Sequence, residues 1–435
     1  MKHKSRCFLS LAIIAAIFLG GGSVIAGTPP RAASFGTPIR IGFQAGDDWE
    51  PALATDQMGH LYAVYAHADP TSQLYQTRMM VQVSSDGGQT WNAPVPIAPA
   101  PPPKSQGQFD PWIAFGPDGR TVSVVLLQGY PQATIQLVTS KDFGATWSTP
   151  KSVTALPPPL DKLVLLARGK TMAVAFTDYK VNTWAAISQD AGAHWTTHLI
   201  ERVGMPNQLL TAGGGIDSLG NIYFAWNGVY LNQPVPTAPV WVTKSSDGGA
   251  TWSHTDVGVS GLPMACPKCQ DHQYFAAQMA LQIGSDDHIY LLWNSTPDQT
   301  DFASERVYFA RSTDHGATYS PRRDISDAPA GIEHCFPTLI TGGAPGDVRI
   351  AWMDQRNGPW NVFYRTSADG GDTFAPSIRL SGYVPGYNYL TPDGFAFPYG
   401  DYFQLAVDLT GRTHAAFGEA RNITKPGNIW IANQQ

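Results

Sequence analysis

Acidic and aromatic side chains recur together at intervals along this chain. Pairs of carboxyl groups can act as acid and base, or as acid and nucleophile, in the cleavage of glycosidic bonds. Aromatic rings can stack on the apolar faces of sugars, while acids and amides bind their hydroxyl groups. The candidates for catalysis are Asp48, Asp110, Glu333, Asp401 and Tyr402.

A second group of aromatic and charged residues is suited to ligand binding. A glycan or glycoconjugate is the ligand class that such a mixture favours. The alternative for each residue is structural, because tryptophan and aspartate at strand ends also pack and cap, and Asp354 with Arg356 can form an ion pair that holds a loop. The candidates for substrate binding are Trp49, Trp112, Trp226, Trp293, Asp354, Arg356, Glu419 and Arg421.

The elements that position these residues follow from a repeated motif. Six segments are alike: SSDGGQTW from Ser84, SKDFGATW from Ser140, SQDAGAHW from Ser188, SSDGGATW from Ser245, STDHGATY from Ser312 and SADGGDTF from Ser367. In each, the Asp can accept backbone N–H bonds, the Gly supplies a positive φ, and the last aromatic residue packs beneath the turn. The motif therefore predicts a hairpin turn, and its residues need not do chemistry.

The spacing of the motif predicts the architecture. The motif aspartates recur at intervals that match the length of a four-stranded propeller blade with its loops: they are Asp86, Asp142, Asp190, Asp247, Asp314 and Asp369. The first unit has apolar or alternating stretches at Pro51–Thr55, His60–Ala66, Met79–Ser84 and Val95–Ala98. We expect an all-β fold, one continuous propeller of four-stranded antiparallel blades over residues 37–435.

A seventh blade and the closure of the ring are predicted from the two ends of the chain. After the sixth motif, Tyr402–Asp408, Thr413–Glu419 and Asn428–Ala432 repeat three strands but no fourth. Thr37–Phe43 resembles the outer strand at Ala375–Ser381 and can supply the missing strand, which would remove an open sheet edge. Seven blades are expected. Six is the alternative, if the weakly patterned unit from Asp161 is not a blade.

The N-terminal segment, residues 1–26, has the layout of a signal peptide. Lys2, Lys4 and Arg6 precede an apolar run, which ends at small residues with cleavage expected after Ala26. The run is short for a membrane-spanning helix, and residues 27–36 form a short linker. We expect a soluble protein exported to the periplasm or outside the cell.

The composition excludes several classes of partner. A hydrophobic fraction of 43% with only 14% charged residues indicates a globular chain. The mature chain keeps 25 basic against 34 acidic residues, a net charge of −9. This balance argues against nucleic acid or anionic lipid as partner, and the sequence implies no cofactor.

The six motifs resemble the Asp-box (BNR) repeat of the sialidase-like superfamily, over roughly residues 37–435. The resemblance implies a propeller whose boxes lie on the face away from the site. It also implies three arginines that grip a substrate carboxylate, an acid/base aspartate, and a tyrosine nucleophile polarised by a glutamate. On this pattern Tyr402 beside Asp401 is the nucleophile candidate, with Glu333 or Glu419 as its partner and Asp48 or Asp110 as acid/base.

The arginine set departs from that pattern. Arg356 and Arg421 occupy equivalent loops of adjacent units, and no third arginine matches. Arg40 resembles the family's R-I-P element, but Gly42 stands in place of the proline and the segment is expected on an outer strand. The expected number of blades departs from the pattern too, because sialidases of the resembled superfamily look six-bladed and seven blades are expected here.

Cysteines and histidines gather in two loops that the repeat makes neighbours. Cys266, Cys269 and His272 lie in one, and His334 and Cys335 in the other. They could bind zinc or copper, but in an oxidising compartment we favour a disulfide from Cys335 to Cys266 or Cys269.

Three functions are therefore carried forward. The first is a sialidase-like glycoside hydrolase and the second a non-catalytic propeller that binds a glycan or a protein. The third is a metal-binding propeller that uses the Cys/His loops.

Overall fold

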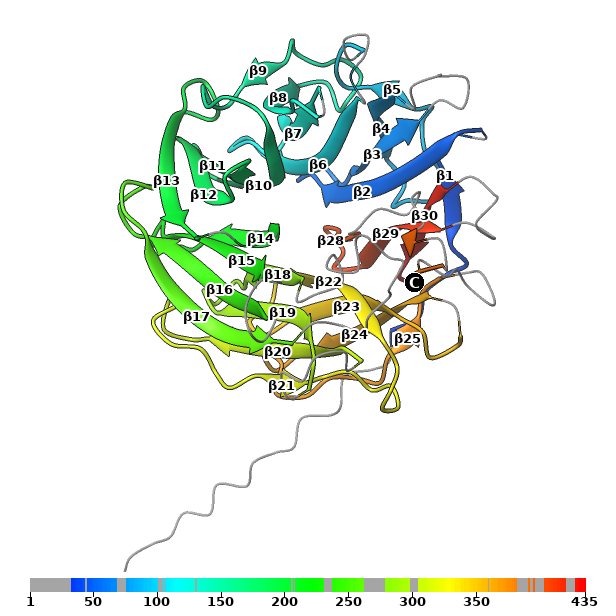
Figure 1. Cartoon of the computed structure of the whole chain (residues 1–435). Coiled ribbons are helices and arrows are strands. Elements are labelled where there is room, and N and C mark those ends of the chain that lie inside the picture. Colours follow the sequence, from blue (N-terminus) through cyan, green and yellow to red (C-terminus); the bar gives the residue numbers. More distant parts are fainter. Residues whose placement is uncertain are drawn as a thin grey trace, which may run out of the picture.

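The computed structural model describes residues 33–43, 45–68, 76–100, 105, 107–129, 131–204, 206, 208–230, 237–261, 278–297, 304–358, 360–381, 390–391, 394–395, 403–419 and 427–435. Seven four-stranded antiparallel sheets surround a central axis, as the view down this axis shows (Figure 1). The predicted seven-bladed, all-β propeller is confirmed. The described residues contain no helix long and apolar enough to cross a membrane.

Each blade runs from the axis outwards in sequence order, because a meander joins neighbouring strands by short turns. Blade 1 comprises β2 (Asp47–Thr55), β3 (Leu61–Ala68), β4 (Thr77–Ser84) and β5 (Val95–Pro96). Blade 2 comprises β6 (Gln108–Phe115), β7 (Val122–Gln128), β8 (Thr134–Ser140) and β9 (Lys151–Ser152). Blade 3, the weakly patterned unit, comprises β10 (Leu160–Arg168), β11 (Thr171–Asp178), β12 (Asn182–Ser188) and β13 (Thr196–Arg202).

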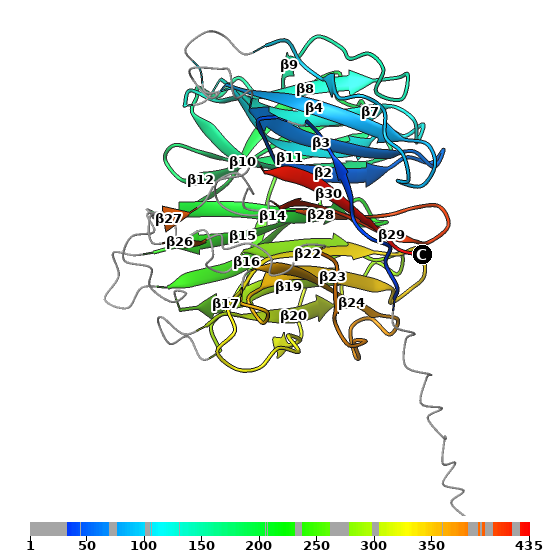
Figure 2. The ribbon, with the colours of Figure 1, turned by 90° about the vertical axis from the view of Figure 1, so that its right-hand side faces the viewer.

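The next three blades repeat this order. Blade 4 comprises β14 (Gln208–Ile216), β15 (Ile222–Val229), β16 (Ala238–Ser245) and β17 (Ser253–Ser260). Blade 5 comprises β18 (Met279–Ile283), β19 (Ile289–Ser295), β20 (Arg306–Ser312) and β21 (Arg323–Asp324). Blade 6 comprises β22 (His334–Thr341), β23 (Val348–Asp354), β24 (Asn361–Ser367) and β25 (Ile378–Arg379), followed by the hairpin β26 (Leu390–Thr391) and β27 (Gly394–Phe395) that Figure 2 shows at one end of the molecule.

Blade 7 joins the two ends of the chain. It comprises β28 (Gln404–Val407), β29 (Thr413–Glu419), β30 (Asn428–Asn433) and, as its outer strand, β1 (Ile39–Ile41). β1 pairs antiparallel to β30, with Ile39 opposite Ile431. The predicted closure by an N-terminal strand is therefore confirmed, and no outer strand is missing from the seventh sheet.

The Asp boxes form the turns that join the third strand of a blade to the fourth. In the first box, Asp86 Oδ1 accepts the backbone N–H of Thr90 at 2.9 Å, and Oδ2 accepts its hydroxyl at 2.6 Å. Ser84 Oγ accepts the N–H of Gly88, and Trp91 Nε1 donates to the Gly88 carbonyl. These bonds hold the pKa of Asp86 down at about 2, chiefly through the Thr90 hydroxyl. The box is a local structural device, as predicted.

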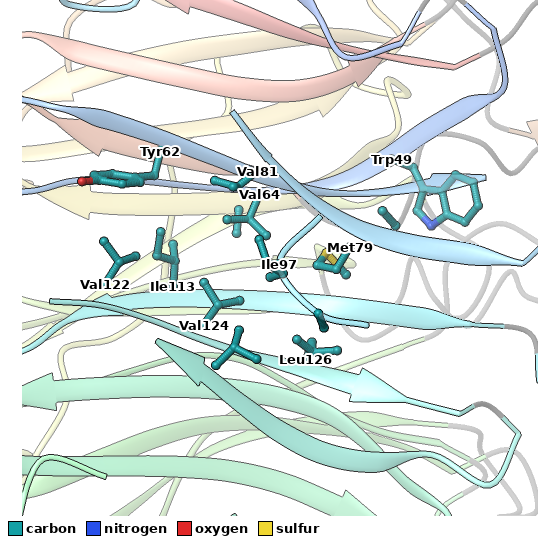
Figure 3. Packing of buried hydrophobic residues seen from close by; sticks show 14 of the residues in the cluster. Trp49, Tyr62, Val64, Met79, Val81, Ile97, Ile113, Val122, Val124 and Leu126 are labelled. Carbon is teal, nitrogen blue, oxygen red and sulfur yellow. The ribbon is translucent and has the colours of Figure 1, made fainter. Parts of the chain in front are cut away.

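The core lies between neighbouring blades. Val64 and Val81 of blade 1 pack against Val122 and Val124 of blade 2, and all four are fully buried (Figure 3). Strand residues that alternate between the two faces of a sheet thus supply apolar side chains to both adjoining interfaces.

Three consecutive glycines let one inner strand approach its neighbour unusually closely. A Cβ on Gly213 of β14 would lie 2.2 Å from the backbone N of Leu281 in β18. The axial channel, about 290 Å³, is correspondingly lined by the inner strands of blades 1, 2, 5, 6 and 7. Its open space is therefore displaced away from blades 3 and 4.

Candidate functional site

The candidate site is a pocket at one end of the axial channel. It lies at the end where the inner strands begin, and the Asp boxes lie at the opposite end. The pocket encloses about 60 Å³, enough for a few water molecules. It opens on the face opposite the Asp boxes, where the sequence predicts the ligand-binding residues. Six blades contribute its described lining: Asp110, Trp112, Lys162, Leu163, Leu210, Thr211, Asn227, Gln278, Phe336, Pro337, Thr338, Phe403 and Gln404.

The inner strands share a repeated break near their starts, and three residues at these breaks, Asp110, Lys162 and Phe336, line the pocket. The ladder between first and second strands shifts register near the start of β2, β6, β10, β14 and β22. At four of these breaks the backbone is left-handed: φ is 53° at Glu50, 51° at Asp110, 43° at Lys162 and 49° at Phe336.

The sequence explains why the ladder breaks there. Glu50, Asp110 and Phe336 are each followed by a proline, which has no N–H to continue the ladder. Bulges of this kind re-aim side chains, and strained non-glycine residues concentrate at functional sites. Four blades thus keep the same costly conformation around one point on the axis.

Asp110 and Lys162 place opposite charges at the pocket. Lys162 Nζ lies 4.0 Å from Asp110 Oδ2, and the two side chains are only 13% and 9% exposed. This separation is long for a charge-assisted hydrogen bond. The amides of Asn227, Gln278 and Gln404 add donors and acceptors.

Of the predicted binding tryptophans, the structure brings one to the pocket. Trp112 lines both the pocket and the axial channel below it. Trp226 and Trp293 are 0% and 1% exposed, and Trp226 Nε1 donates to Thr243. Trp49 is 8% exposed and packs between blades 1 and 2 (Figure 3). These three tryptophans pack blades, and no sugar platform is present at their positions.

Asp48, a candidate acid/base, is fully buried. Its Oδ2 accepts the N–H of Phe43 at 2.9 Å, and its Oδ1 lies 2.8 Å from His67 Nδ1. Burial raises the pKa of Asp48, and the His67 bond opposes that rise. The Asp48 carboxylate is therefore closed to solvent, whereas 10% of the His67 side chain is exposed.

Glu333 belongs to a buried acidic cluster outside the pocket lining. Its side chain accepts the N–H of Glu305 at 3.2 Å, and burial raises its pKa to about 8. His334 Nδ1 lies 2.8 Å from the Glu305 carbonyl, and its Nε2 lies 3.7 Å from Asp354. The protonated form of Glu333 is thus the stable one at neutral pH.

Arg356 is committed to neighbouring carboxylates. Its Nη2 lies 2.6 Å from Asp354 and 3.0 Å from Asp327, and its guanidinium stacks 4.0 Å from the ring centroid of Phe363. This is the loop-holding ion pair that was the structural alternative. Arg40 lies on the outer strand β1, as expected, and donates to the Phe43 carbonyl. Neither arginine lines the pocket.

Several predicted residues lie outside the described residues: Asp401, Tyr402, Arg421, Cys266, Cys269, His272 and the side chain of Glu419. Cys335 is a free and fully buried thiol, and the two predicted partners of its disulfide lie outside the described residues. Within the described part of the chain, no group of three or more His, Cys, Asp or Glu side chains is arranged to hold a metal ion.

Two charged residues of functional interest were missed in the sequence. Lys162 occupies the position of Asp110 and Glu50 in the next blade, so an alignment of the repeats at the strand starts would have found it. Glu305 carries no such signal, since it directly precedes the third strand β20 and meets Glu333 only through the packing of blades 5 and 6.

Comparisons with known proteins bear on the repeat and the fold. Residues 82–93 match the family model of the BNR/Asp-box repeat. No curated protein matches the chain. The solved structures that are similar to this one have low sequence identity to it, so their likeness concerns the fold.

Three such structures illustrate the likeness. A protein of unknown function from Dyadobacter fermentans DSM 18053 is 14% identical, with 93% of this chain and 99% of that one covered and a TM-score of 0.54. A polysaccharide lyase, the PL25 ulvan lyase bound to -[GlcA(1-4)Rha3S]-, is 10% identical, with 90% and 95% covered and a TM-score of 0.58. The Hadza microbial sialidase Hz136 is 14% identical, with 89% and 66% covered and a TM-score of 0.49.

Proposed function

We propose that this Asp-box repeat protein, a seven-bladed propeller of the sialidase-like kind, binds a glycan over its axial pocket. The observation that carries the proposal is the set of strained bulges. Four inner strands hold a non-glycine residue at positive φ at the same position, and three of these residues, Glu50, Asp110 and Lys162, are charged. Such backbone strain costs about 1–3 kcal/mol per residue, and strained residues cluster at sites where the direction of a side chain serves a function.

The lining has the chemistry of a sugar site. Trp112 offers an aromatic surface, Asp110 accepts hydrogen bonds, and Lys162 and the amides of Asn227 and Gln404 donate them. Sugars present apolar ring faces and hydroxyl groups that suit this combination. The ulvan lyase that shares the fold is solved with a bound oligosaccharide. We further propose that the chain is exported, because its N-terminal segment, residues 1–26, has the layout of a signal peptide.

Binding of a glycan panel to the full mature chain tests the proposal. Asp110→Asn and Lys162→Gln should each weaken binding about tenfold, since hydrogen bonds to charged groups contribute about 1.5–3 kcal/mol. Lys170→Gln is the matched control, because Lys170 lies in the turn at the other end of the same strand, β10. Failure of the wild type to bind any member of the panel would refute the proposal.

Glycoside hydrolysis of the sialidase-like kind is the second candidate. The observation that favours it is Glu333, whose pKa of about 8 gives the protonated form that a general acid needs. Against it, Asp110 is the one carboxylate in the described lining, whereas the reaction uses a pair of catalytic groups. Turnover of a fluorogenic sialoside or another aryl glycoside that is lost in Tyr402→Phe and Glu333→Gln would establish it. No turnover across the panel would leave binding alone.

A further inference from the structure

A buried carboxylate and a histidine form a dyad on the ligand face of blade 1. Asp48 of β2 and His67 of β3 are directly opposed in the ladder, so their side chains lie on the same face of the sheet. His67 Nδ1 is 2.8 Å from Asp48 Oδ1, and Asp48 is 0% exposed. The Nδ1···Oδ1 hydrogen bond therefore joins the two side chains away from solvent.

Two residues, Phe43 and Asp48, fix the imidazole. Phe43 stacks on the ring with centroids 3.7 Å apart and planes within 21°. The N–H of Phe43 donates to the second oxygen of Asp48, which keeps that carboxylate from rotating. Nε2 makes no hydrogen bond to any residue in the described part of the chain, and 10% of the side chain is exposed. The ring therefore holds its Nε2 edge in a set direction.

Three other histidine–aspartate pairs of the described chain lie at turns, whereas His334 and Asp354 are opposed in the ladder at the pocket end, as Asp48 and His67 are. His60, His194 and His414 each contact an aspartate that also accepts backbone N–H groups of its own turn, at the box end of the propeller. Asp48 closes no such turn. It lies instead at the end of the inner strand where the pocket opens, between the blades that supply Gln404 and Asp110.

The geometry points to His67 as a proton-accepting group for a hydroxyl-bearing ligand on this face, oriented by Asp48. The inference rests on the proposed function for its ligand class. In the step, a hydroxyl group of the glycan or a water molecule loses its proton, and the Nε2–H bond forms as the O–H bond breaks. The buried Asp48 carboxylate stabilises the imidazolium, and the proton returns from Nε2 to the same oxygen, so that no charge remains on the ligand. Asp48, predicted as the acid/base, thus acts as a positioning residue.

The tautomer of His67 gives the first test. Long-range ¹H–¹⁵N spectra of the full mature chain at pH 7.5 should show Nδ1 protonated and Nε2 unprotonated. Asp48→Asn should reverse or abolish that preference, because an amide can donate to Nδ1, and a thermal melt verifies that the variant is folded. A proton on Nε2 of the wild type would overturn the inference.

Chemical modification gives the second test and separates it from the proposed function. Diethyl pyrocarbonate should acylate His67, located by peptide mass spectrometry, and a glycan that requires Asp110 for binding should protect it at least fivefold. His194, 90% exposed at the box end, is the control that the same glycan should not protect. If such a glycan binds and leaves His67 unprotected, this inference fails while the proposed function stands. If no glycan binds, the proposed function fails, and the inference about His67 fails with it.

Discussion

Replacing Glu333 with glutamine should stabilise the protein at neutral and alkaline pH. The residue is 8% exposed, and burial raises the pKa of its carboxyl group from 4.5 to about 8. The folded state therefore holds the proton more tightly than the unfolded chain. The resulting stability is fully present below about pH 4.5 and is lost as the pH rises towards 8.

The magnitude follows from the size of the shift. One pH unit corresponds to about 1.4 kcal/mol per proton. The wild type should therefore lose on the order of 4 kcal/mol of unfolding free energy between pH 4.5 and 8 through this group. Glutamine has nearly the same shape and no proton to lose. The variant should match the wild type near pH 5 and exceed it by about 3 kcal/mol at pH 8.

Guanidinium denaturation at pH 5, 6.5 and 8, followed by tryptophan fluorescence, measures this difference. Asp372→Asn is the control, because that side chain is 63% exposed and paired at the surface with Arg311. Its effect should stay within about 0.5 kcal/mol at every pH. An equal gap between wild type and Glu333→Gln at pH 5 and pH 8 would refute the reasoning.

Three other changes test the packing, the arginine and the box. Gly213→Ala should cost about 3 kcal/mol or more, since its Cβ would meet the Leu281 backbone at 2.2 Å, whereas Gly343→Ala, with no atom within 4 Å, should cost little in the same melts. Arg356→Gln should lower stability by about 2 kcal/mol and leave glycan affinity within about twofold. A large loss of affinity without a loss of stability would instead support a role for Arg356 in binding a substrate carboxylate. Asp86→Ala should lower stability by about 1 kcal/mol at pH 7, and because its pKa is held down at about 2, the difference from wild type should shrink as the pH falls from 4 to 2.

The fold was predictable because its signals are local. Each Asp box closes its own turn, with Asp86 bonding residues three and four positions later. Six blades follow from the spacing of these turns. The seventh follows from three strand-like segments after the last box, and ring closure follows from the likeness of an N-terminal segment to an outer strand. None of these inferences needs knowledge of which residues meet across the molecule.

The site was harder to predict because a bulge changes which side chain faces the axis. Trp226 and Trp293 follow the alternation of a buried strand and end in the core. Lys162 reaches the pocket because its backbone is left-handed. One residue of register decides between core and pocket, and the sequence alone does not place that residue.

The sequence by itself determined the repeat, the seven blades and the closing strand, because each depends on turns and strands that short segments encode. Only the tertiary structure decided that His67 stands in front of Asp48, that Arg356 is bound by carboxylates, and that Glu305 meets Glu333. Those relations depend on contacts between strands and blades, where a shift of a few ångströms separates a buried pair from a group that a ligand can reach.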